Sequence, residues 1–432
     1  MKQPLVINEG FASVTSSMIN LFDEFVGLAA MSLPWCFAQT GVVLGLASLV
    51  VVAIVLAMSF EVLTGACEVA QRRSYRGLAV ATLGPLTATL VEACRFCYLL
   101  GIGIACTVLV IDSILGNGTG LAPALLGIGN RETLFTRLIA SGIYHGTTTL
   151  PLALSKTLEG FKHAATLALA TVVYACVVVV FRGILDGGPV DLAFKPSGIL
   201  AIVPALNYMF LMHANVPRYY DELKNRSPAR MRLATAGATG AATCLYVAIG
   251  VSGLVAFGPG VKSNVLLEFS PTNRPAMLAR ASILVCSATT LSKIIHPMRD
   301  ALVRVVGKDE LADHGADALD EVAYVALTTS LVAFVAVGGA FFASFGFATV
   351  LSYNSALFGS GVGFFFPVLF YLGTRNNDPS SSSSRDEPPD DDDDDPSHLT
   401  AGPRTTLALV FAWAFVTPGA YLASQFLLPT SS

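Results

Sequence analysis

The side chains best placed for chemistry are three charged groups at the edges of long apolar stretches. Asp23 and Glu24 come directly before a stretch without charged residues that runs from Phe25 to Phe60, and Lys293 follows a similar stretch further along the chain. If such stretches cross a membrane, a charge near the centre of a span costs about 2.5–3.5 kcal/mol, so charged groups there usually bind ions, protons or substrates. Because Asp23 and Glu24 are adjacent, they point about 100° apart on a helix. Only one of them can face a site squarely.

Two of the apolar stretches contain residues that interrupt helices. The first has Gly27, Ala29 and Pro34 within a few positions, and another, from Pro204 to Pro217, has a proline at each end and polar groups between. Proline removes a backbone donor and kinks a helix. Interrupted helices inside a membrane leave N–H and C=O groups unpaired, and a pair of them marks the binding site of many transporters. The alternative is a bent helix that packs through small residues.

The composition indicates that most of the chain faces lipid. Of 432 residues, 53% are hydrophobic and 13% are charged, whereas charged residues usually make up about a quarter of a soluble protein. The apolar stretches lack the alternation of a membrane barrel, so the predicted fold class is an all-α polytopic membrane protein. Stretches long enough to span the hydrocarbon layer predict eleven helices, near residues 12–36, 42–66, 86–112, 138–155, 162–181, 197–214, 232–257, 277–297, 321–343, 347–373 and 404–428.

The loops predict an orientation and a division into parts. Lys and Arg are more frequent in the segments on the side of the N-terminus, which should be cytoplasmic, with the C-terminus extracellular or luminal. Residues 1–374 form the predicted transporter core, and 404–432 form the last helix and the C-terminus. Between them, 375–403 contains runs of Ser and Asp that cannot bury an apolar core, so we expect a disordered acidic cytoplasmic loop. Its part from 376 to 398 is a candidate binding region for a regulator.

Other functional classes have little support in the sequence. The acidic run lies in a segment too disordered to hold a metal geometry, so we expect no metal site, and the convergent groups that an enzyme needs are lacking. The net charge of -4 comes from that run, and nothing indicates nucleic acid as a partner. Asn117-Gly118-Thr119 is an acceptor sequence for N-glycosylation in a loop predicted to lie outside.

Several motifs in order along the chain resemble the amino acid/auxin permease family, which includes sodium-coupled neutral amino acid transporters and vacuolar and vesicular relatives. The segment from Asn20 to Gly41 is similar to the family's opening pattern, NL-x-N-x-x-x-G-x-G-x-x-x-LP and then a glycine. Further matches lie at Tyr219–Asn225, Phe257–Gly258, Ser263–Leu267 and His296–Leu302. The resemblance implies an amino acid substrate and a place in the plasma membrane or a vacuolar or lysosomal membrane.

The resemblance also implies a leucine-transporter-like fold, in which two inverted halves of five helices, about 12–181 and 197–373, are followed by one extra helix. Family members work by alternating access as secondary active amino acid transporters, and they bind the substrate where the first and sixth helices unwind. The positions that match are Asn20, Gly27, Leu28, Ala29, Asn207, Tyr208 and Phe210. In sodium-coupled relatives the eighth helix supplies a threonine hydroxyl to the cation, which matches Thr289 or Thr290.

Departures from the family pattern bear on the coupling ion. Ala29 stands where the family usually has a glycine, Asp23 replaces an asparagine, and Glu24 replaces a small residue. Lys293 can pair with either carboxylate and place a tethered cation at the sodium position, which favours H+ over Na+ as the coupling ion. A lysine so near a helix end can equally snorkel to the interface. Two alternatives stay open: recognition of a cationic amino acid by the carboxylates, and a receptor-like sensor with little flux.

Overall fold

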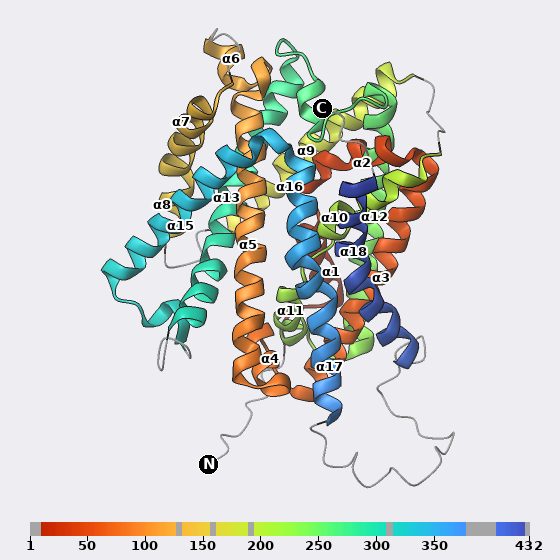
Figure 1. Cartoon of the computed structure of the whole chain (residues 1–432), viewed down its shortest axis with the longest axis vertical. Coiled ribbons are helices and arrows are strands. Elements are labelled where there is room, and N and C mark those ends of the chain that lie inside the picture. The colour runs from red at the N-terminus through yellow and green to blue at the C-terminus, as the bar shows by residue number, and fades with distance from the viewer. Residues whose placement is uncertain are drawn as a thin grey trace.

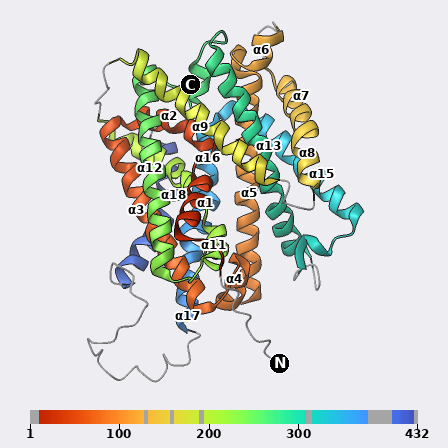
Figure 2. The same ribbon diagram turned by 180° about the vertical axis from the view of Figure 1, so that it is seen from behind.

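The computed structural model describes residues 10–126, 132–155, 161–188, 194–307, 314–376 and 403–427. Within these ranges the chain is helical, and the strand-like pairing found there is a single parallel β-bridge between Ala12 and Leu223. The long helices run side by side, as two opposite views show (Figures 1 and 2). The predicted all-α fold class is confirmed. The acidic loop predicted at 375–403 lies almost wholly outside the described residues.

Seven helices of the described ranges are long and apolar enough to cross a membrane, and two bent pairs that pass the same test together raise the number to as many as nine. The bent pairs are Val14–Phe25 with Leu28–Thr40, at 48°, and Phe347–Gly359 with Gly361–Arg375, at 42°. The chain is therefore an integral membrane protein. The predicted spans at 138–155 and 404–428 are helical as well, but they are not among these nine.

The first half of the chain places most of its helices where the apolar stretches predict them. Their bounds are α1 Val14–Phe25, η1 Leu28–Ser32, α2 Leu33–Thr40, α3 Val42–Ala70, α4 Tyr75–Leu83, α5 Pro85–Ile114, η2 Gly116–Gly118, α6 Leu121–Leu126, α7 Leu134–Tyr144, the π-helical turn η3 His145–Thr149, α8 Leu150–Leu154 and α9 Phe161–Asp186.

The second half repeats the pattern of long helices with short helical turns between them. Their bounds are η4 Pro196–Gly198, α10 Ile199–Met209, η5 His213–Asn215, α11 Val216–Glu222, α12 Pro228–Phe257, η6 Val265–Glu268, α13 Arg274–Val306, η7 Gly315–Ala318, α15 Glu321–Phe342, η8 Ala343–Phe345, α16 Phe347–Asn354, the π-helical turns η9 Ser355–Gly359 and η10 Gly361–Phe365, α17 Phe366–Asn376 and α18 Pro403–Leu427.

The sixth span is longer than its hydropathy predicts. The predicted end at 214 was set by the charged residues that follow, whereas the chain continues as α11 to Glu222. The reason is tertiary packing: Val216, Pro217 and Tyr220 are buried, and α11 contacts α3. For the same reason α13 continues to Val306, beyond the predicted end at 297, with Met298, Arg299 and Ala301 buried. Burial against neighbouring helices outweighs local polarity at both ends.

The helices form two groups. In one, α5 packs against α13 and α15, and α15 packs against α7. In the other, α12 packs against α1, α2 and α3, and α10 packs against α3 and α18. In Figure 1 the first group lies to the left and the second to the right, with α9 and α16 between them. Both of these helices contact members of the two groups. This arrangement puts α1 and α10 at the inner side of the second group.

Small residues let α2 lie close to its neighbours. The Phe37 ring lies between Gly45 of α3 and Gly250 of α12, where an added Cβ would come within 2.5 and 2.6 Å of ring carbons. A Cβ at Gly253 would lie 2.3 Å from Cγ of Pro34. Side chains at these glycines would push α2 away from the rest of the second group. The glycines of α3 and α12 therefore fix the position of α2, the second part of the first span.

Candidate functional site

The first span is broken at Gly27. Ser13 caps the start of α1 by accepting a hydrogen bond from the Ser16 N–H, and the helix ends when the Val26 N–H donates to the Phe22 carbonyl, 2.9 Å away. Gly27 is extended, with φ -123° and ψ -171°, before the 3-10 turn η1 and then α2, which has Pro34 in its first turn. The predicted interruption is confirmed, and it lies where small residues and a proline follow one another.

The sixth span is broken in the same manner. The last turn of α10 tightens, with the Phe210 N–H donating to the Asn207 carbonyl and the Leu211 N–H donating to the Tyr208 carbonyl. The chain then passes through η5 before α11, which has Pro217 in its first turn. This interruption is also confirmed. Each span therefore offers the free backbone groups that a helix end leaves without an intrahelical partner.

The two breaks lie together. The rings of Phe25, the last residue of α1, and Phe210, directly after α10, meet edge to face with centroids 5.6 Å apart. The hydroxyl of Tyr246 on α12 lies 2.5 Å from the Phe25 carbonyl oxygen and 3.0 Å from the Met209 carbonyl oxygen. The turn η1 also contacts α10 and α13. The structure thus brings Gly27, Leu28, Ala29 and Phe210 into one region.

Glu24 joins the two spans on one side of the breaks. Its carboxylate accepts hydrogen bonds from the Tyr219 hydroxyl, at 3.0 Å, and from the Asn215 amide nitrogen, at 3.3 Å. Both donors belong to the segment after the break of the sixth span. The backbone adds a further link, because the Ala12 N–H donates to the Glu222 carbonyl and the Lys224 N–H donates to the Ala12 carbonyl, each at 2.9 Å. Contacts at Glu24, near the end of α1, and at Ala12, just before its start, therefore hold α1 against α11.

Asp23 is in a different environment from Glu24. Its side chain is half-buried, and the charge of Lys293 on α13 acts on its carboxylate. Among the described residues neither carboxylate forms an ion pair with Lys293, whose side chain is exposed. The structure thus places Lys293 near Asp23 without direct contact, and it leaves Glu24 with its two uncharged partners.

The threonines of α13 lie one turn before Lys293. Thr289 is buried and its hydroxyl donates to the Cys286 carbonyl at 2.8 Å, whereas Thr290 is half-buried and lies 3.7 Å from the Cys286 sulfur. A hydroxyl that donates to its own helix still has lone pairs to offer to a cation. Both threonines belong to the helix that η1 contacts, and Lys293 follows them on the same helix.

Two of the predicted substrate contacts lie apart from this region. Asn207 is fully buried, but its amide nitrogen donates to the Thr417 hydroxyl at 2.6 Å and its amide oxygen accepts from the Trp413 indole at 3.1 Å, so its side chain is occupied by α18. Asn20 is exposed on α1, about two turns before Gly27. Tyr208 is half-buried, with its ring 6.4 Å from that of Tyr98 on α5.

Comparison with known proteins decides the family. Residues 10–386 match the family described as "Transmembrane amino acid transporter protein". The chain belongs to this family. It is not an enzyme family, and the resemblance of the motifs is thereby confirmed.

Relatives of this chain include animal and fungal proteins. Solute carrier family 38 member 10 of Rattus norvegicus is 27% identical over 368 residues, which cover 83% of this chain and 33% of the relative. A putative sodium-coupled neutral amino acid transporter 10 of Xenopus laevis is 25% identical over 370 residues, covering 83% of this chain and 34% of the relative. Vacuolar amino acid transporter 5 of Schizosaccharomyces pombe is 23% identical over 321 residues, 73% of this chain and 74% of the relative. The chain spans about a third of the length of the first two.

Some residues that organise the breaks were not predicted from the sequence. Tyr98 donates from α5 to the Leu211 carbonyl at 3.2 Å, and Asn354 of α16 donates to the Tyr98 carbonyl at 3.0 Å. Tyr246 bonds the Phe25 and Met209 carbonyls, and Tyr219 bonds the Glu24 carboxylate. The available signal was weak: each is an isolated tyrosine or asparagine in or beside an apolar stretch. Their partners are more than a hundred residues away, except that Met209, one of the two partners of Tyr246, is 37 residues away.

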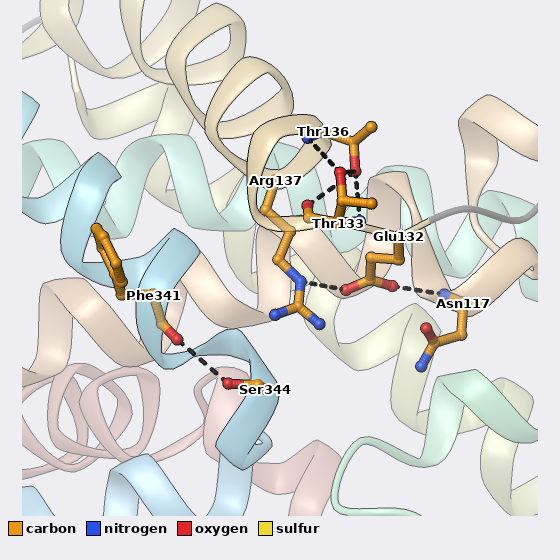
Figure 3. A network of polar contacts seen from close by, with 7 residues as sticks. All are labelled: Asn117, Glu132, Thr133, Thr136, Arg137, Phe341 and Ser344. Atoms are coloured by element: carbon orange, nitrogen blue, oxygen red, sulfur yellow. Dashed lines mark hydrogen bonds and ion pairs between the residues drawn. The ribbon is translucent and has the colours of Figure 1, made fainter.

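The acceptor sequence for glycosylation lies at the opposite end of the molecule from α4, near α6 and α7. Glu132 joins this region by accepting from the Asn117 backbone N–H at 2.9 Å and from Arg137 Nε at 2.7 Å (Figure 3). In the same view Ser344 donates to the Phe341 carbonyl on the neighbouring helix. The Asn117 side chain is exposed and takes part in none of the contacts drawn. Its amide is therefore accessible.

Proposed function

We propose that this protein carries amino acids across a membrane by alternating access, as a secondary active transporter, with the substrate bound at the breaks of the first and sixth spans and with protons as the coupling ion. The observation that carries the proposal is the meeting of the two breaks at Phe25, Phe210 and Tyr246. The amino acid substrate agrees with the names of the Xenopus laevis and Schizosaccharomyces pombe relatives.

The chemistry of the breaks suits a zwitterion. The C-terminal ends of α1 and α10 carry partial negative charge, which attracts an ammonium group, and the turn before α2 presents the positive end of a helix to a carboxylate. Gly27, Leu28 and Ala29 would contribute backbone groups, while Tyr208 and Phe210 would shape the pocket for the side chain. Asn20 would contact the substrate only after α1 moves, because it is exposed about two turns before Gly27 in this structure. Asn207 would act indirectly, since α18 occupies its amide.

The architecture supports movement of one helix group against the other. We infer eleven spans, arranged as two inverted halves of five, 12–181 and 197–373, with α18 as the extra helix. In this arrangement the group containing α1, α3, α10 and α12 would rock against the group containing α5, α13 and α15. Contacts between α1 and α11 through Glu24 and Ala12 would keep the two interrupted spans together during that movement.

The environment of Asp23 supports protons as the coupling ion. A half-buried carboxylate near the tethered charge of Lys293 can bind and release a proton without needing a metal cation nearby. Sodium coupling would use Thr289 or Thr290, and the name of the Xenopus laevis relative makes sodium the second candidate. A cationic substrate recognised by Asp23 is the third.

The proposed setting is the plasma membrane or a vacuolar or lysosomal membrane, with the N-terminus cytoplasmic. The name of the Schizosaccharomyces pombe relative favours the vacuole. A regulator bound to residues 376–398 would act from the cytoplasmic side, and that segment lies outside the described residues apart from Asn376.

Uptake into proteoliposomes tests the proposal. The purified protein is assayed with each of the twenty standard amino acids, with Na+ replaced by choline and with pH varied separately on the two sides. We expect saturable uptake of a subset of neutral amino acids that increases when the side of uptake is acidified and does not require Na+. Uptake that requires Na+ at every pH would assign sodium coupling, and a preference for lysine and arginine would assign a cationic substrate. No uptake of any amino acid would contradict the proposal.

A further inference from the structure

Tyr246 is the residue that links both broken spans. It lies near the middle of α12 and is fully buried, and its ring packs edge to face on Phe210 with centroids 5.2 Å apart. Its hydroxyl lies within 3.0 Å of two carbonyl oxygens, of Phe25 and of Met209. These are the last residues of α1 and α10. One side chain therefore contacts the C-terminal ends of both half-helices.

A phenol has only one hydrogen to donate. It is shared between two carbonyl groups that lie at helix ends, where backbone dipoles leave partial negative charge. Without the hydroxyl, these two negative ends would face each other in a buried position, with no other side-chain donor bonded to them in the described parts of the chain. A buried acceptor without a donor is costly, so the two ends would separate or recruit another positive group.

We propose that Tyr246 is a positioning residue for substrate binding, because its hydroxyl sets the distance and angle between the breaks of the first and sixth spans. The inference rests on the proposed function, since it concerns the same site. The substrate is bound by backbone groups from both breaks, so a change in their separation would weaken binding of the whole zwitterion. The hydroxyl also keeps the two ends together without any bound cation.

The test is the conservative variant Tyr246→Phe, which removes one oxygen and keeps the ring against Phe210. Tyr144→Phe is the matched control: the Tyr144 hydroxyl donates to one backbone carbonyl, that of Leu284 at 2.6 Å, and joins α7 to α13 without bonding either Phe25 or Met209. Both proteins are reconstituted, and KM and kcat are measured for the amino acid that the unmodified protein takes up fastest. Elution from size-exclusion chromatography and the thermal midpoint show whether each variant is folded.

We expect Tyr246→Phe to raise KM by about tenfold, in line with the loss of a buried hydrogen-bond donor, with a smaller change in kcat. Tyr144→Phe should leave KM within about twofold of its original value. KM does not depend on how much protein is active, so a lower yield of the variant does not obscure the result. Direct binding of the same labelled amino acid in detergent should weaken by the same factor as KM rises.

The outcomes separate the two proposals. If the unmodified protein transports but Tyr246→Phe has an unchanged KM, whatever its kcat, the positioning role is wrong and the proposed function stands. If both tyrosine variants raise KM equally, the effect is general loss of packing and the positioning role is again wrong. If the unmodified protein neither binds nor takes up any amino acid, the proposed function fails and the inference fails with it.

Discussion

The Glu24 carboxylate accepts a hydrogen bond from the Tyr219 hydroxyl at 3.0 Å, so the first and sixth spans are joined directly on one side of their breaks. Asp23, the adjacent residue, has no such partner among the described side chains and instead lies within the electrostatic reach of Lys293. Two neighbouring carboxylates thus have different environments. Glu24 is held in a structural contact, and Asp23 is the better candidate for a group that gains and loses a proton during transport.

Exchanging each carboxylate for its amide tests that assignment. Asp23→Asn should remove most of the dependence of uptake on pH, because the variant carries no group that protonates there. Glu24→Gln should keep the pH dependence, because a glutamine can still accept from Tyr219 through its amide oxygen. The measurement is initial uptake into proteoliposomes across a series of external pH values. Full pH dependence in Asp23→Asn protein would exclude Asp23 as the proton carrier.

Removal of the positive charge near Asp23 tests the choice of coupling ion. Lys293→Ala should lower proton-driven uptake by roughly tenfold, the factor that corresponds to about 1.4 kcal/mol of lost interaction, and should make uptake respond to Na+. The reason is that, without the lysine ammonium, the proposed cation position beside Thr289 and the Asp23 carboxylate can accept a metal ion. Lys262→Ala, on the loop before η6, serves as the control. Sodium-independent uptake at the original rate in Lys293→Ala protein would show that the lysine only snorkels.

The close approach of α2 to α12 predicts a steric effect. Gly253→Ala places a Cβ 2.3 Å from Cγ of Pro34, whose ring cannot turn away, so we expect a loss of about 1–3 kcal/mol of stability from overpacking. Gly240→Ala lies on the same helix with nothing within 4 Å of the added Cβ, and it should be neutral or slightly stabilising. Thermal unfolding in detergent compares the two. Equal midpoints for the two variants would mean that α2 is free to move aside.

The acceptor sequence at Asn117 predicts both a modification and an orientation. Expressed in a eukaryotic cell, the protein should migrate faster on a denaturing gel after removal of N-linked glycans, and Asn117→Gln should abolish that shift. A second acceptor sequence, Asn225-Arg226-Ser227, lies in a loop predicted to be cytoplasmic, so Asn225→Gln should change nothing. A shift that depends on Asn225 would reverse the predicted orientation of the chain.

The sequence predicted those features that depend on local backbone chemistry. Gly27 and Pro34 in one span and Pro217 in the other disfavour a continuous helix, and both interruptions are present, although α10 continues through Pro204 to Met209. The apolar stretches likewise predicted the long helices, because burial in lipid requires each of them to satisfy its own hydrogen bonds.

Features that depend on distant packing were not predicted. Asn207 was expected to face the substrate, but its amide is bonded to Trp413 and Thr417, about two hundred residues further along the chain. The tyrosine at position 246 lies in a span rich in small residues, and nothing near it in sequence indicates that its hydroxyl reaches two other helices. Likewise, α11 is helical because it packs against α3, although the charged residues of α11 are typical of a loop. Such contacts follow from the tertiary fold and not from local pattern.

The most direct test of the central claim is accumulation against a gradient. Proteoliposomes loaded with the transported amino acid at the external concentration are given an imposed pH gradient, acidic outside, with Na+ absent. The account predicts that the internal amino acid rises above the external level and returns to it when a protonophore is added. Saturable binding with no accumulation under any pH or sodium gradient would contradict it, and would identify a sensor instead of a transporter.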